Sequence, residues 1–103
     1  MKEEIQINAA IVETLRQYFK GQPVLKVWLF GSFARGEEKS DSDIDILVTF
    51  DGSIGLFKYA SMQSDLKNIL NKNVDLVSDS ALFPWVKESV YNDRILIYER
   101  ETA

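Results

Sequence analysis

The sequence predicts an α/β (α+β) domain in which helices pack on a small mixed β-sheet. Two patterns lead to this prediction. Short runs of apolar and β-branched residues, typical of buried strands, recur along the chain. Longer segments with apolar side chains at helical spacing lie between them. The 103 residues contain no internal repeat, low-complexity tract or linker, so we expect a single domain over residues 1–103.

The first predicted element is a helix over residues 3–20. It begins with acidic side chains, which suit the positive end of a helix dipole, and Gly21 and Pro23 end it. One side of this helix carries an apolar stripe that predicts its buried face, formed by Ile5, Val12, Leu15 and Phe19.

Three segments are predicted to be strands. Residues 44–50 (IDILVTF) form the strongest of them, and residues 25–30 (LKVWLF) and 74–77 (VDLV) are shorter or more mixed. Residues 94–99 (RILIYE) fit either a last strand or the extension of a helix, and the pattern leaves both open.

Two further helices are predicted in the second half of the chain. One covers residues 56–71, with one apolar side formed by Leu56, Tyr59, Leu66, Ile69 and Leu70. The other would be capped by Asp79 and Ser80 and would hold Pro84 in its first turn. Its predicted buried face consists of Trp85, Val86 and Val90. The apolar neighbours of Trp28 and Trp85 favour core positions for both rings over stacking on a base.

Composition excludes several classes of function. The chain has no cysteine and no histidine, which removes disulfides, thiolate chemistry, imidazole metal sites and Ser-His-Asp catalysis. The formal net charge of -4 argues against strong binding to nucleic acid, which depends on neutralising phosphates. No apolar run approaches the roughly 20 residues that span a bilayer. The acidic start does not resemble a secretory signal, so we expect a cytoplasmic protein without membrane association.

Three aspartates carry the strongest chemical signal. Asp43 and Asp45 are two residues apart at the start of a predicted strand, so their side chains share one face while Ile44 and Ile46 point into a core. Asp75 lies in the strand over residues 74–77 and can face the same site if the two strands are neighbours. Carboxylates held side by side repel each other unless a cation lies between them, and Mg²⁺ prefers such oxygen ligands. Acids at strand ends are also often merely solvated.

A small-residue turn, Gly31-Ser32, follows the strand over residues 25–30. Glycine lets the backbone approach a ligand closely, and such turns bind phosphate oxygens, although a plain turn would look the same. A P-loop is excluded because Glu37 and Glu38 stand where lysine and serine or threonine are required. An EF-hand calcium loop starting at Asp41 is excluded because its sixth and twelfth positions are isoleucine and glycine.

Together, the turn and the acids resemble a known signature. Leu29-Phe30-Gly31-Ser32, ten spacer residues and then Asp43-Ile44-Asp45 match the polymerase-beta-type nucleotidyltransferase superfamily, and Asp75 matches its third carboxylate. The Gly-Ser-Phe-Ala-Arg-Gly motif and the short chain look most like the minimal nucleotidyltransferase (MNT) branch.

The resemblance implies a role for each matching residue. Gly31 and Ser32 would bind the triphosphate of ATP, with Arg35 close enough to assist. Asp43 and Asp45 would hold two Mg²⁺ ions, and Asp75 would ligate the catalytic ion and help to activate an acceptor hydroxyl. Many minimal members are antitoxins paired with a HEPN-domain toxin, and the family implies transfer of AMP to a tyrosine of that toxin.

Other functions remain open on the sequence alone. The chain could be a non-catalytic antitoxin that neutralises its partner by binding, with acids that are inherited but unused. It could instead modify a small molecule, as aminoglycoside nucleotidyltransferases do, although those enzymes are generally longer. A structural or calcium-binding domain is the most remote reading, because the calcium loop is broken.

Overall fold

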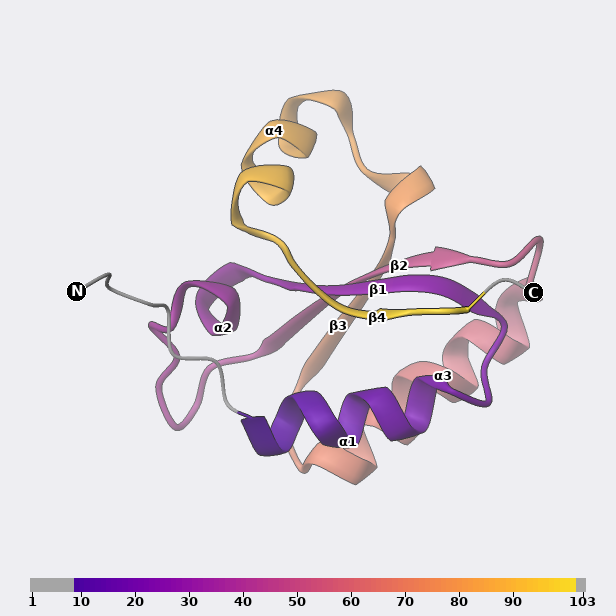
Figure 1. Ribbon diagram of the computed structural model, residues 1–103, viewed down its shortest axis with the longest axis horizontal. Helices are drawn as coiled ribbons and strands as arrows, with labels where there is room; N and C mark the ends of the chain where they lie inside the picture. The colour runs from indigo at the N-terminus through magenta and orange to yellow at the C-terminus, as the bar shows by residue number, and fades with distance from the viewer. Residues whose placement is uncertain (1–8, 102–103) are drawn as a thin grey trace.

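A computed structural model describes residues 9–101 of the chain. Four α-helices, four strands and a short 3-10 turn lie within these residues (Figure 1). In chain order they are α1 (Ala9–Phe19), β1 (Val24–Phe30), α2 (Gly31–Arg35), β2 (Ile44–Phe50), α3 (Gly55–Leu70), β3 (Val74–Ser78), η1 (Asp79–Ala81), α4 (Pro84–Asp93) and β4 (Ile95–Glu99).

The four strands form one sheet in the order β3-β2-β1-β4. β1 pairs antiparallel with both β2 and β4, whereas β2 and β3 are parallel and α3 connects them. The predicted mixed sheet with packed helices is therefore confirmed. The segment over residues 94–99, which the sequence left open, is a strand from Ile95 to Glu99.

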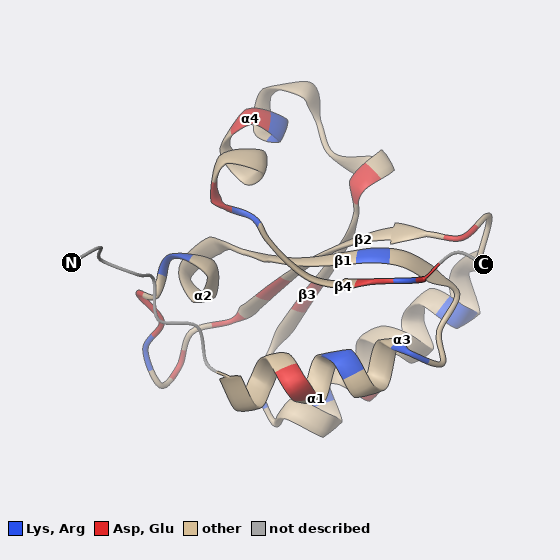
Figure 2. Cartoon of the chain, in the orientation of Figure 1, with Lys and Arg blue, Asp and Glu red and all other residues tan. Residues whose placement is uncertain are grey.

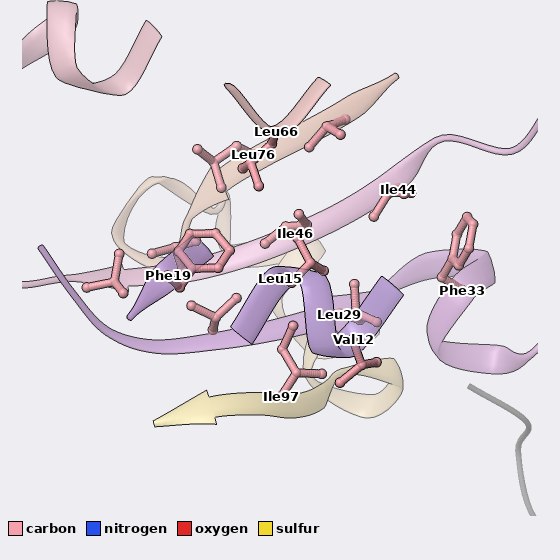
Figure 3. Packing of buried hydrophobic residues seen from close by; sticks show 14 of the residues in the cluster. Val12, Leu15, Phe19, Leu29, Phe33, Ile44, Ile46, Leu66, Leu76 and Ile97 are labelled. Atoms are coloured by element: carbon pink, nitrogen blue, oxygen red, sulfur yellow. The ribbon is translucent and has the colours of Figure 1, made fainter. Parts of the chain in front are cut away.

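Helices α1 and α3 cover one face of this sheet and form the main core (Figures 1 and 3). The predicted stripe of α1 is buried at its described positions, and Ile44 and Ile46 of β2 point into the same core. The larger side chains of this core are Leu15, Phe19, Leu29, Phe33, Ile44, Ile46, Met62, Leu66 and Leu76.

Helix α4 lies on the opposite face of the sheet and covers only part of it (Figure 1). A second, smaller core forms beneath it from the buried side chains of Trp28, Leu47 and Val90. The partly buried residues around these three are Phe30, Val77, Leu82 and Val86. The rest of this face carries the aspartates of β2 and β3.

Side chains of the helices close the two edges of the sheet. The Tyr59 hydroxyl and the Gln63 side-chain amide of α3 donate to the carbonyls of Leu76 and Val74 in β3. At the other edge, Arg16 Nε of α1 donates to the Ile97 carbonyl of β4 at 2.7 Å. Backbone groups left open at a sheet edge invite pairing with other chains, and these bonds reduce that exposure.

The first helix agrees with its prediction only in part. Within the described residues it runs from Ala9 to Phe19, so it ends one residue earlier than expected. The start predicted at residue 3, with its acidic side chains and Ile5, lies outside the described residues.

The predicted apolar side of α3 was wrong at two positions. Leu56 is 78% exposed because it lies in the first turn, one turn before the residues that reach the core. Ile69 is half exposed at the surface seam between α1 and α3. Met62, which the prediction missed, is fully buried with Leu66.

The predicted start and buried face of α4 also need correction. Asp79 and Ser80 do not cap it, because they form the separate turn η1, and α4 begins at Pro84 without a side-chain cap. Trp85 is 78% exposed and stacks on Phe83 with ring centroids 4.8 Å apart, so its predicted core position was wrong. Trp28, Val86 and Val90 are buried or partly buried as predicted.

Candidate active site

Strand pairing brings the Gly31-Ser32 turn next to Asp45. Phe30, the last residue of β1, is the register partner of Asp45 in β2, so Gly31 leaves the sheet beside that carboxylate. Gly31 has a φ of +71°, and a Cβ added to it would lie 2.2 Å from Asp45 Oδ2. Both observations require glycine here, because other residues would be strained and would displace the carboxylate.

The parallel pairing of β2 and β3 brings the other two acids to the same place. Asp45 is directly in register with Asp75, and Asp43 precedes Asp45 by two residues. Figure 2 shows these acidic positions of β2 and β3 side by side. Asp43 and Asp75 are exposed and Asp45 is partly buried. The three acids that the sequence singled out therefore lie together with Gly31 at one end of the sheet.

This cluster shifts the titration of its central member. Burial raises the pKa of Asp45 to about 6, and the neighbouring carboxylates of Asp75 and Asp43 contribute to the rise. The guanidinium of Arg35 acts in the opposite direction. Asp45 thus lies in a field of like charge that a bound cation would relieve.

Helix α2 is a single short turn anchored by its own apolar residues. Phe33 and Ala34 are buried in the main core, while Ser32 is partly exposed at the start of the turn. The helix ends at Gly36 in a left-handed conformation, and the Glu37 N–H donates to the Ser32 carbonyl at 2.9 Å. The turn that carries Gly31 and Ser32 is thereby fixed relative to β2.

Arg35 is the last residue of α2 and is held by two carboxylates. Its Nε donates to Glu37 Oε1 at 2.9 Å, and its Nη1 donates to Asp93 Oδ2 of α4 at 2.7 Å. These hydrogen bonds raise the pKa of the Arg35 guanidinium. The sequence did not predict either partner: Asp93 lies 58 residues away and carries no motif.

The acids lie on an open face rather than inside a cavity. Within residues 9–101, no group of three acidic side chains is already gathered as the ligand set of one metal ion. The pocket of about 440 Å³ at this end of the sheet is a separate polar cleft beyond Asp43, lined in part by Ser42, Lys67, Lys72 and Asn73. None of the three acids lines this cleft, so the strand register defines the candidate site.

Comparison with known protein families identifies the family of the chain. Residues 13–103 match the polymerase beta nucleotidyltransferase family. The chain therefore belongs to the polymerase-beta-type nucleotidyltransferase family, and the enzyme class predicted from the Gly-Ser turn and the acids is confirmed at that level.

Relatives of similar length place the chain near the minimal branch of this family. Protein adenylyltransferase MntA of Thermococcus cleftensis is 36% identical over 96 residues, which cover 92% of this chain and 94% of the relative. A solved structure assigned to a minimal nucleotidyltransferase is 35% identical, with a TM-score of 0.72 over 84% of this chain and 88% of the other.

More distant structures share the fold. A toxin–antitoxin structure with AMP-PNP has a TM-score of 0.76 at 20% identity, covering 87% of this chain and 74% of the other. A complex of a tri-AMPylated HEPN toxin of Shewanella oneidensis with its MNT antitoxin has a TM-score of 0.62 at 21% identity, covering 88% and 68%. Among residues 9–101, no helix has the length and apolar character needed to cross a membrane.

Proposed function

We propose that this protein is a Mg²⁺-dependent adenylyltransferase that moves AMP from ATP to an acceptor hydroxyl. We further propose that the acceptor is a tyrosine of a HEPN-domain toxin, which the protein neutralises as an antitoxin. The observation that carries the proposal is the strand register that sets Asp45 beside both Gly31 and Asp75. The protein adenylyltransferase of T. cleftensis and the toxin–antitoxin complexes of this fold support the choice of acceptor.

Gly31, Ser32 and Arg35 are proposed to bind the triphosphate. Gly31 presents backbone without a side chain, Ser32 adds a hydroxyl donor, and Arg35 adds a cation at the end of the same turn. The short turn is anchored in the core, so these donors stay fixed while the ligand enters. Fixed donors reduce the free energy lost in ordering the site during reaction.

The donor set suits Mg²⁺. Three carboxylates share one face. Burial raises the pKa of Asp45, and the charges of Asp75 and Asp43 add to the rise, so a bound cation would stabilise the ionised group. The acids do not enclose one point, as expected where ligand phosphates complete the coordination. We propose that Asp43 and Asp45 hold two ions and that Asp75 shares one of them. When bound, the ions would neutralise charge on the transferring phosphoryl group.

Asp75 is proposed to have a second role on the acceptor side. It belongs to β3, the strand farther from Gly31, with β2 between them. A triphosphate held at the end of β1 would leave the β3 side open for the attacking hydroxyl, in line with the leaving group. The exposed Asp75 carboxylate can accept the proton of that hydroxyl.

The first experiment incubates the purified protein with ATP labelled at the α-phosphate, Mg²⁺ and a lysate of its own host. Asp43→Asn and Asp45→Asn should each reduce labelling of a discrete protein band at least about a hundredfold, since each removes several kcal/mol of transition-state stabilisation. Asp41→Asn is the matched control, because Asp41 is an exposed acid two residues before the site. It should label normally.

The outcomes separate the proposal from its alternatives. Near-normal labelling by both site variants would contradict the assignment of the acids. Label in a small-molecule fraction would favour an aminoglycoside-type transferase. Absence of label, with toxin neutralisation that survives Asp43→Asn and Asp45→Asn, would favour an antitoxin that acts by binding alone.

A further inference from the structure

Arg35 is held by two carboxylates that come from different parts of the chain. Glu37 follows it by two residues, whereas Asp93 is the last residue of α4 and reaches it from across the molecule. The Arg35 and Asp93 side chains are 42% and 30% exposed. Ion pairs this exposed add little to folding stability. The pair from Arg35 to α4 therefore calls for an explanation other than stability.

The geometry of the guanidinium suggests what the pair does. Arginine has five N–H donors in a planar fork, and here Nε and Nη1 are directed to the two carboxylates. Among the described residues, Nη2 has no hydrogen-bond partner, and the charge of Arg35 acts on Asp45. Two fixed nitrogens determine the plane of the fork and hence the direction of the third.

We propose that Asp93 is a positioning residue that holds Arg35 in place to bind the triphosphate of ATP. This inference rests on the proposed function, because it assumes that the triphosphate binds at the Gly31-Ser32 turn. The inference gives α4 a role in nucleotide binding, in addition to its packing in the small core. The end of α4 would support the nucleotide site through Asp93, while Trp28, Leu47 and Val90 hold the helix on the sheet.

The proposal and simple electrostatics predict opposite changes in ATP affinity for Asp93→Asn. Asp93 is an acid near a site for an anion, so removing its charge should strengthen ATP binding if only charge matters. If Asp93 positions Arg35, Asp93→Asn should instead weaken binding, because the guanidinium loses its fixed direction and must be ordered when the ligand binds. The direction of the change therefore separates the two accounts.

The test measures binding of Mg-ATP and of AMP to the purified protein by titration calorimetry, without any acceptor. Asp93→Asn should raise the Kd for ATP about five- to tenfold and leave the Kd for AMP within about twofold, since AMP lacks the β- and γ-phosphates. Asp93→Glu should restore part of the loss. Asp51→Asn is the matched control, because Asp51 forms a similarly exposed pair with Arg100 at 2.6 Å. It should bind ATP as the wild type does.

Thermal unfolding of each variant separates positioning from misfolding. The melting temperature of Asp93→Asn should lie within a few degrees of that of the Asp51→Asn control. Equal or tighter ATP binding by Asp93→Asn, or equal losses for ATP and AMP, would overturn the inference. Absence of ATP binding by the wild type would instead contradict the proposed function.

Discussion

The two faces of the sheet have different constructions. One face is covered by α1 and α3, and its buried strand residues are apolar. The other face is divided between a small core beneath α4 and an open area with Asp43, Asp45 and Asp75. Alternation along β2 supplies both faces at once, since successive side chains point in opposite directions. The difference indicates that stability resides mainly on one face, which leaves the other free to hold like charges together.

The difference between the two cores is clearest at two adjacent residues of β2. Ile46 and Leu47 are both fully buried, but Ile46 belongs to the main core and Leu47 to the small core. We expect Ile46→Ala to lower the free energy of unfolding by about 4 kcal/mol and Leu47→Ala by about 2 kcal/mol. The large core, packed from several elements, has less freedom to close a cavity than the space beneath a single helix. Urea unfolding of both variants measures the difference.

Equal losses in the two variants would break the comparison between the faces. That result would mean that α4 is packed as rigidly as α1 and α3, and that the two cores contribute alike. A larger loss for Leu47→Ala would reverse the comparison and place the structural centre beneath α4.

Much of the fold follows from local patterns in the sequence. The alternation in residues 44–50 gave the strand at its observed bounds and assigned Ile44 and Ile46 to the core. The Asp-x-Asp spacing put two acids on one face for the same reason. Strand order could not be read in this way, because pairing depends on contacts between distant segments. From the sequence, Asp75 could share the site with Asp45 only if the two strands were neighbours. The structure shows that the strands pair and that these two residues are in register.

The failed core assignments share a physical cause. Apolar side chains were assigned to the core by type, but a helix buries only the stripe that faces its partner. Val86 and Val90 are four residues apart on one side of α4, and Trp85 lies about 100° away from Val86 around the helix. The contact between Asp93 and Arg35 had no sequence signal, since single surface charges 58 residues apart carry no pattern.

The raised pKa of Asp45, caused first by its burial and then by the neighbouring carboxylates, should appear in the pH dependence of stability. The folded state raises the pKa of Asp45 from 3.8 to about 6, so folding takes up a proton between these values. The contribution of Asp45 to stability is present below about pH 4 and is lost as the pH rises through about 6. Asp45→Asn should therefore be more stable than the wild type at pH 7 by about 1 kcal/mol, allowing for solvent screening.

Urea unfolding in EDTA at pH 4 and pH 7 measures this effect. The advantage of Asp45→Asn should largely vanish at pH 4, where both proteins are neutral at this position. Added Mg²⁺ should stabilise the wild type at pH 7 more than the variant. An advantage of equal size at both pH values would show that it does not arise from charge.

The smallest expected effect concerns the outer surface of α4. Trp85 is 78% exposed and contacts Phe83, so Trp85→Ala should change the free energy of unfolding by less than about 0.5 kcal/mol. Trp28→Ala is the control, because Trp28 of β1 is buried beneath the inner side of α4, and it should cost about 3–5 kcal/mol. Chemical denaturation of the isolated protein at low concentration compares the two. A cost for Trp85→Ala that grows with protein concentration would mean that a second copy covers this ring.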